Sequence, residues 1–164
     1  MKWPSAIEKI RRNHALEHAT IHILSQRCPR AQLIGHSDAD GFVIYGHVPT
    51  EIVAATASEA LARLQAGERD LAVHPRCGTN LAMGALLTGA TSFLVMKSSA
   101  KRKMSNLPGV LLATTLALMA AQPLGLKVQE LITTSANLDT ALIADVKRYI
   151  LRGLTVHRVF VHHE

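Results

Sequence analysis

Apolar residues recur at helical spacing over residues 5–28, which predicts a long first helix. Ser5 with Glu8 three residues later matches a capping box, and Cys28-Pro29 marks the end of the helix. In one stripe of this helix, formed by positions 7, 10, 14, 17, 18 and 21, two histidines and a glutamate interrupt a row of isoleucines. The pattern therefore places polar side chains at half-buried positions, where hydrogen bonds or a metal must satisfy them.

The next segment changes from helical to strand periodicity and back. Two short β-like runs, Ala31–His36 and Gly41–Val48, are separated by the turn formers of residues 37–41. A second amphipathic helix is predicted from Thr50 to about Gln65. Leu71–Val73 is expected to form a further short strand.

Two long runs without charge follow, from Gly78 to Met96 and from Met104 to Leu126. Each is close to the roughly 20 residues that a helix needs to cross a bilayer core. They predict a membrane helical hairpin whose second helix bends or ends near Pro123. Glycine, serine and threonine dilute both runs, so two buried helices of a soluble bundle are the alternative.

The C-terminal part returns to soluble character. Residues 128–134 are expected to continue as helix or loop, and Ala141–Leu151 with Leu154–His162 to form a β-hairpin around Arg152-Gly153. The predicted fold class is α+β, a small α/β sandwich with an inserted two-helix transmembrane hairpin. Residues 1–77 carry the first helix, β-hairpin and second helix, residues 78–126 the membrane hairpin, and residues 127–164 the closing β-hairpin.

Positive charge is concentrated between the two apolar runs. The 164 residues have a formal net charge of +6, and Lys97, Lys101, Arg102 and Lys103 supply much of it. Such a cluster beside apolar helices favours lipid headgroups. Aromatic residues make up only 4% of the chain and no nucleic-acid motif accompanies the cluster, which disfavours nucleic acid as a partner. The expected partner is therefore a lipid bilayer.

The N-terminal residues do not show the pattern of a signal peptide, because a charged amphipathic helix begins almost at once. This favours an integral protein of the cell inner membrane with its N- and C-terminal parts in the cytoplasm. The basic connection between the apolar runs would itself prefer the cytoplasmic side, which is the opposite orientation. The missing signal pattern is the stronger argument for the cytoplasmic orientation, because translocating a folded segment of roughly 77 residues usually needs a signal.

The string His14-Ala15-Leu16-Glu17-His18 is the main candidate for chemistry. Residues four apart lie above one another on a helix, so His14 and His18 can bind one metal ion with Glu17 beside them. In such a site Glu17 would activate the metal-bound water. The alternative is a set of hydrogen-bonded histidines with Glu17 as their acceptor. His22 extends the row as a possible third ligand or outer partner.

Further ligands are expected just before the first apolar run. His74 and Cys77 are the candidates, since Cys77 would stand beside Arg76 at a helix N-terminus, where a thiolate is favoured. A closed site of His14, His18, His74 and Cys77 would be structural rather than catalytic. Equally, Cys77 could simply pack as a small hydrophobe. Glu59 ranks below His74, because Arg63 four residues on suggests a surface ion pair.

The remaining histidines and cysteines carry weaker expectations. Surface or edge-strand positions are expected for the other histidines: His36, His47, His157, His162 and His163. Cys28 and Cys77 are expected to be reduced thiols, because two cysteines outside a C-x-x-C are too few for a disulfide framework.

The chain resembles known proteins at two levels. The segments HALEHAT (14–20), LAVHPRCGTN (71–80) and QPLG (122–125) are similar to signatures of an uncharacterised bacterial domain-of-unknown-function family of small membrane-associated proteins, a resemblance that covers most of the chain. His14, Glu17 and His18 resemble the short motif of the inverzincin metallopeptidases. That second resemblance implies zinc on the two histidines and a glutamate that activates water.

Taken together, the sequence predicts a membrane-anchored metal-binding protein with Zn²⁺ as the expected metal. Hydrolysis of a peptide or membrane-protein substrate is the activity expected if the zinc is catalytic. Two alternatives stay open at this point: a non-catalytic membrane-anchored interaction module with a structural histidine cluster, and a thiol enzyme that uses Cys77. The sequence does not predict the oligomeric state.

Overall fold

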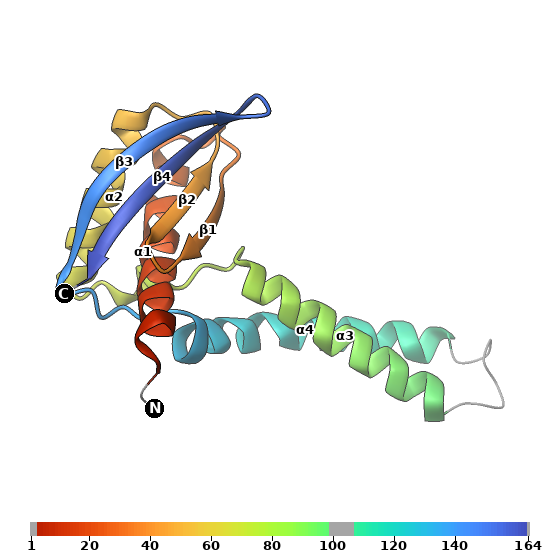
Figure 1. The fold of residues 1–164 in the computed structure, drawn as a ribbon. Coiled ribbons are helices and arrows are strands. Elements are labelled where there is room, and N and C mark those ends of the chain that lie inside the picture. The colour runs from red at the N-terminus through yellow and green to blue at the C-terminus, as the bar shows by residue number, and fades with distance from the viewer. Residues whose placement is uncertain (1–2, 99–106, 164) are drawn as a thin grey trace. The chain divides into compact units, whose positions relative to one another are not determined.

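The computed structural model describes residues 3–98 and 107–163. They form a mixed structure of helices and an antiparallel sheet, so the expected α+β class is confirmed (Figure 1). The chain divides into two compact units, one of Met1–His74 with Glu130–Glu164 and one of Pro75–Gln129. We call them the α/β unit and the helical unit and describe each by itself. Lys101, Arg102 and Lys103 of the predicted basic cluster lie outside the described residues.

The α/β unit is built on one four-stranded sheet. Its strands are β1 (Ile34–Asp38), β2 (Gly41–Tyr45), β3 (Ala141–Leu151) and β4 (Leu154–His163), in the spatial order β1-β2-β4-β3. All neighbours are antiparallel, so both predicted β-hairpins are present and they join through β2 and β4. Gly41 permits this junction, because its φ is +144° and a Cβ there would overlap the carbonyl of Val159.

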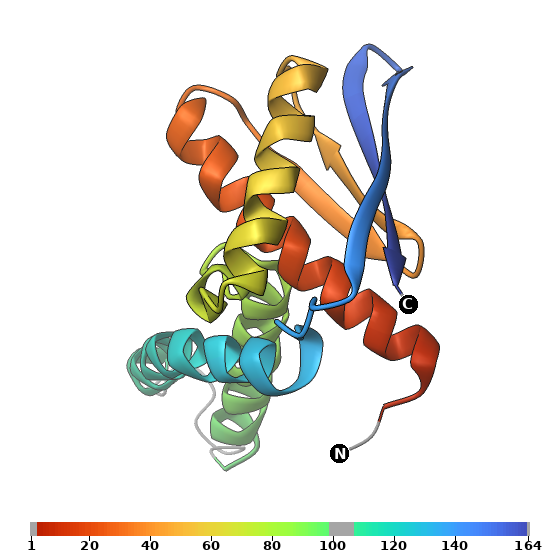
Figure 2. The same ribbon diagram turned by 90° about the vertical axis from the view of Figure 1, so that its left-hand side faces the viewer.

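Helices α1 (Ser5–Arg27) and α2 (Thr50–Gln65) lie on the same face of the sheet (Figure 2). Inward-facing side chains of both layers form one core. Its fully buried members include Leu16, Leu24, Phe42, Ile44, Val53 and Val159. The unit is therefore a two-layer arrangement whose helical layer carries the HxxEH string.

Local details of two predictions are corrected. The N-cap of α1 is Pro4 with no side-chain cap bond, because Glu8 accepts hydrogen bonds from Arg11 and Ser135 instead. Residues expected to form a strand near Leu71 form the 3₁₀ helix η1 (Arg69–Ala72). After α4 (Leu107–Val128), the chain continues as helix, as expected, in the π-helical turn η2 (Gln129–Thr133).

Two histidines expected at the surface are buried. His157 is fully buried and His163 is 9% exposed. Both belong to β4, which pairs with β2 on one side and β3 on the other, so β4 is a central strand. They are separated from the core residues Val159 and Val161 by steps of two residues, so they lie on the same face of the strand and face the helices. His36, His47 and His162 are exposed, as expected.

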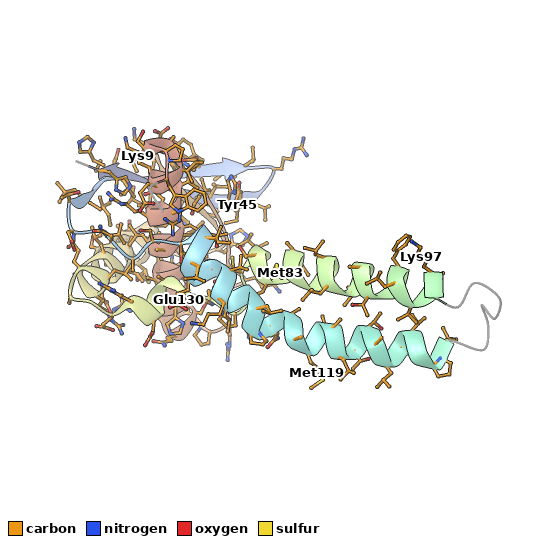
Figure 3. All side chains as sticks on the ribbon, turned by 90° about the horizontal axis from the view of Figure 1, so that it is seen from below. Lys9, Tyr45, Met83, Lys97, Met119 and Glu130 are labelled. Carbon is orange, nitrogen blue, oxygen red and sulfur yellow. The ribbon has the colours of Figure 1, made fainter. Side chains whose placement is uncertain are left out.

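The helical unit contains α3 (Gly78–Ser98) and α4 (Leu107–Val128). Both are long and apolar enough to cross a membrane, and most of their side chains lie outside any protein core. Met83 and Met119 project from α3 and α4, and Lys97 stands near the end of α3 (Figure 3). Pro123 does not end the second helix, which continues to Val128.

Two of the signature segments meet inside the helical unit. Asn80 at the start of α3 donates a hydrogen bond to the carbonyl of Pro75 and accepts one from Gln129 at 2.9 Å. A Cβ at Gly125 would overlap the Asn80 side chain. The glycine of the QPLG segment thus makes room for the asparagine that ends LAVHPRCGTN, which fixes the open end of the helical pair.

Candidate metal centre

The third and fourth turns of α1 bring two imidazoles together. His14 and His18 are one turn apart, their ring centroids are 4.3 Å apart, and the rings meet at 62°. A nitrogen of each ring lies within 4.8 Å of a nitrogen of the other. His18 is buried and His14 half-buried. The helical spacing predicted from the sequence is therefore realised as a pair of neighbouring rings.

Backbone carbonyls fix the protonation of both rings. The Nδ1 of His14 is 2.9 Å from the carbonyl oxygen of Thr133, and the Nδ1 of His18 is 2.8 Å from that of Ala72. A carbonyl oxygen can only accept, so in both rings Nδ1–H donates. In the neutral imidazole this leaves the lone pair on Nε2. Bonding of the second nitrogen to a carbonyl is the arrangement that orients histidine ligands in metal sites.

The two carbonyls come from the two irregular turns of the α/β unit. Ala72 ends η1, and Thr133 ends η2. Arg11 holds the second turn in place, because its guanidinium donates to the carbonyls of Leu131, Ile132 and Thr134. The backbone N–H of Ser135 donates in turn to the carbonyl of Arg11. The helix that carries the histidines thus also positions their acceptors.

His74 is the third imidazole at this place. Its ring centroid lies 5.9 Å from that of His18 and 6.3 Å from that of His22. Two imidazoles on one tetrahedral zinc, with Zn–N bonds near 2 Å, have ring centroids roughly 5 Å apart. The distance between the ring centroids of His14 and His18, 4.3 Å, is shorter than this value, and that between His18 and His74, 5.9 Å, is longer. His22 exchanges a hydrogen bond with Gln26 at 3.0 Å, which leaves it an outer partner of His74.

Glu17 faces a different neighbour. Its carboxylate accepts a hydrogen bond from the Ser37 hydroxyl of β1, and the residue is only 5% exposed. Gly35, also on β1, lies directly against this carboxylate, since a Cβ there would overlap Glu17 Oε1. The same turn of α1 therefore presents imidazoles toward the two irregular turns and a buried, oriented carboxylate toward the sheet.

Two further ligand candidates from the sequence are Cys77 and Glu59. Cys77 belongs to the helical unit, where its Sγ accepts a hydrogen bond from the backbone N–H of Thr79 at 3.4 Å, and its role as a ligand stays a prediction. Cys28 and Cys77 are both free thiols. Glu59 forms the expected ion pair with Arg63 and a second one with Arg27. Glu59 is thus occupied at the helix surface.

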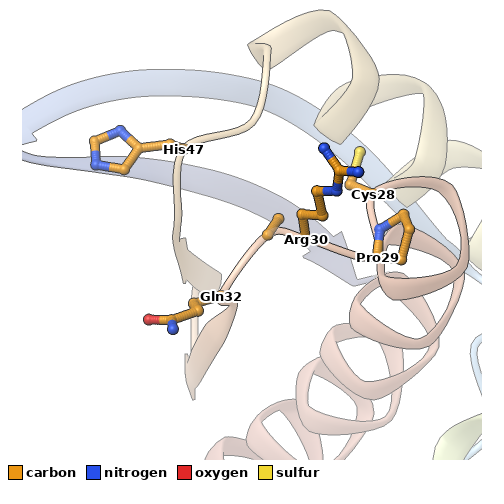
Figure 4. A pocket seen from close by; sticks show the side chains of 6 residues that line it. Cys28, Pro29, Arg30, Gln32 and His47 are labelled. Carbon is orange, nitrogen blue, oxygen red and sulfur yellow. The ribbon is translucent and has the colours of Figure 1, made fainter.

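A shallow pocket lies away from these histidines, at the C-terminal end of α1 (Figure 4). It is lined by Cys28, Pro29, Arg30, Ala31, Gln32 and His47. His47 shares a hydrogen bond with the Thr155 hydroxyl at 3.1 Å. The pocket holds none of the predicted site residues.

Comparison with known proteins places the chain in a family. Residues 9–146, which include the HxxEH string, match the family model described as "Domain of unknown function (DUF6391)". The chain belongs to this family. It is also 36% identical over 146 residues to an uncharacterized protein of Picosynechococcus sp. strain PCC 7002, covering 81% of this chain and 69% of that protein. No solved structure matches the chain significantly. The resemblance to an uncharacterised family is thereby confirmed.

Proposed function

We propose that this DUF6391 protein is a membrane-associated zinc-binding protein whose metal is held by His14, His18 and His74. The observation that carries the proposal is the pair of carbonyl bonds to Nδ1 of His14 and His18, because these bonds select the neutral tautomer whose lone pair is on Nε2. Neutral imidazole is a preferred ligand of zinc. The ring of His74 beside His18 supports it as a third ligand.

Cys77 is proposed as a further ligand on sequence grounds alone. It follows His74 by three residues, so the chain keeps it within about 11 Å of that histidine. A fourth protein ligand would close the coordination sphere and make the zinc structural. With three ligands the remaining position is open to water, which zinc acidifies to a pKa near 7.

Hydrolysis of an amide or ester is the activity that Glu17 adds to this proposal. The HxxEH string supplies a carboxylate one residue from His18 on the same helix. Such a carboxylate can accept the proton of a zinc-bound water. A peptide or membrane-protein substrate is proposed because α3 and α4 suit a bilayer. An integral inner-membrane protein with cytoplasmic N- and C-terminal parts remains our proposed location.

Metal content tests the zinc site. The full chain, purified in detergent without a histidine tag, is expected to contain about one zinc per chain by elemental mass spectrometry. The variant His14→Ala/His18→Ala should lose it, whereas His36→Ala/His47→Ala, which removes two exposed histidines, should keep it. Absence of zinc from the zinc-loaded wild type, or equal loss in both variants, contradicts the proposal. His74→Ala and Cys77→Ser, measured alongside, assign the remaining ligands.

Glu17→Gln separates a catalytic zinc from a structural one. Glutamine keeps an oxygen that can accept the Ser37 hydrogen bond, so the fold and the zinc content should be retained. Hydrolysis of a fluorogenic peptide library should fall by roughly 100-fold or more, because the proton acceptor is lost. A zinc-loaded wild type without hydrolysis, or a Glu17→Gln variant as active as wild type, removes the hydrolase and leaves the zinc protein.

A further inference from the structure

The β3–β4 hairpin extends beyond the rest of its sheet. The pairing of β4 with β2 ends at Val156, which faces Tyr45. The pairing of β4 with β3 continues to Leu154, which faces Leu151 (Figure 1). The connection is tight, since Arg152 and Gly153 both have positive φ, 49° and 82°. The Gly46 N–H still donates to the carbonyl of Thr155, so the projecting two-stranded ribbon consists of residues 150–154.

This ribbon exposes aliphatic side chains on both of its faces. Leu151 and Leu154 are cross-strand partners on one face, and Ile150 points to the other. Their exposed fractions are 57% for Leu151, 53% for Leu154 and 69% for Ile150. A flat protein surface could cover only one face of such a ribbon, whereas a lipid surface that the ribbon enters covers both.

The neighbouring row of the sheet continues this apolar surface. Ile34, Tyr45, Val156 and Tyr149 face one another across the four strands, next to the turn. Ile34 is 70% exposed and Tyr149 49% exposed. Tyr45 and Tyr149 are the two tyrosines of the whole chain. Tyrosine is enriched at the depth of lipid headgroups, where its ring is buried and its hydroxyl stays hydrated.

The charges around the turn have one sign. Arg148 and Arg152 flank the exposed aliphatic residues, and the sequence contains no aspartate or glutamate between Asp145 and Glu164. Arginines at such positions can extend toward phosphate groups while their stems cover apolar surface. Apolar side chains at the tip with arginines and tyrosine behind them match the layering of an anionic bilayer.

We propose that the β3–β4 turn inserts into the headgroup region of a membrane that contains anionic lipid. The contact is made by Tyr149, Ile150, Leu151 and Leu154, with Arg148 and Arg152 on lipid phosphates. It gives the α/β unit a lipid contact of its own, in addition to the apolar helices of the helical unit. The proposal does not depend on the zinc site.

A single tryptophan reporter tests the insertion. The chain has one tryptophan, Trp3, so Trp3→Phe provides a silent background. Ile150→Trp is then compared with Ser58→Trp, an exposed position on α2, in the full chain reconstituted into nanodiscs. Brominated acyl chains should quench the reporter at 150 at least about twofold more than the one at 58. The measurement is made with chelator present, which keeps it independent of any metal.

Charge and alternative occupants are tested in the same system. Arg148→Glu/Arg152→Glu should reduce the quenching at 150 in nanodiscs with phosphatidylglycerol, whereas Arg30→Glu/Arg69→Glu, an equal charge change elsewhere in the α/β unit, should not. Equal quenching at positions 150 and 58 overturns the proposal. So does an emission at 150 that is blue-shifted and concentration-dependent but unaffected by brominated lipid, because a second protein copy would then cover the turn.

Discussion

The α/β unit holds two groups of buried or half-buried histidines that differ in what their rings contact. The histidines at α1, His14 and His18 on the helix and His74 beside it, converge, and the carbonyls of Thr133 and Ala72 leave His14 and His18 with Nε2 as acceptor. The strand histidines, His157 and His163, are single rings in the core beneath the helices. Burial alone therefore does not identify a histidine as a candidate metal ligand. A candidate ligand is identified by rings that converge and by a hydrogen bond that fixes the tautomer.

The strand histidines show what burial without convergence produces. Burial lowers the pKa of His157, and burial together with the nearby Arg12 and Lys9 cations lowers the pKa of His163. His163 Nε2–H donates to Asn13 Oδ1 at 2.7 Å, and the Asn13 amide donates to the carbonyl of Asp38. The His163 ring thus links β4 to α1 through Asn13, and neither strand histidine belongs to the proposed zinc site.

The largest expected difference between the two groups is the response to zinc. A free zinc concentration of about 1,000 times Kd should raise the free energy of unfolding of the wild type by about 4 kcal/mol. His18→Ala should abolish this increase, whereas His157→Leu should lower the stability without zinc but keep the increase. Thermal unfolding followed by circular dichroism, with and without zinc, measures both. A zinc response that His157→Leu removes and His18→Ala keeps would reverse the comparison.

The next test uses Asn13, because its side chain hydrogen-bonds the strand histidine His163. Asn13→Ala removes a hydrogen-bond partner from the buried His163 ring and from the half-buried Asp38 carbonyl, which should cost about 2 kcal/mol of unfolding free energy. Asn137→Ala, at an exposed position, should change stability by less than about 0.5 kcal/mol. Urea unfolding of both variants in detergent gives the values. Equal stability of the two variants would show that the Asn13 network contributes nothing.

Acidification gives the smallest and most specific difference. Since the folded pKa values of His157 and His163 lie below the unfolded value of about 6.5, the unfolded chain binds more protons just below that pH. Stability of the zinc-free protein should therefore fall as the pH drops below about 6.5. His157→Leu should reduce this slope, and His36→Asn, at an exposed position of β1, should leave it unchanged.

Carboxylates titrate in a separate window and provide an internal reference. The hydrogen bonds from Arg158 lower the pKa of Asp38, so its contribution is lost only as the pH falls below its unfolded value of about 4. A slope between pH 6.5 and 5 that survives His157→Leu intact would assign the acid sensitivity to groups other than His157.

The sequence predicted what depends on local periodicity. The i, i+4 spacing of His14 and His18 predicted two rings on one helix face, and the turn residues Arg152-Gly153 predicted the second β-hairpin. Neither inference needed long-range contacts. The helix and hairpins were therefore correct before any tertiary information was considered.

What the sequence left out depends on contacts between distant segments. The carbonyls of Thr133 and Ala72 become partners of the histidines only because two irregular turns pack on α1, and no local signal marks them. His157 was misplaced because strand order in the sheet differs from strand order in the chain. One signal was present: His157 and His163 share the alternation of Val159 and Val161, which face the core.

The strand order also constrains the course of biosynthesis. β2 can be completed on its second edge only by β4, which lies at the C-terminal end of the chain, and the whole helical unit is translated between them. The first 74 residues therefore cannot complete their fold until both apolar helices have left the ribosome. Until then one edge of the sheet is unpaired and the core-facing side of α1 is incompletely covered. If these helices enter a membrane during translation, the α/β unit is the last part of the protein to fold and folds already tethered.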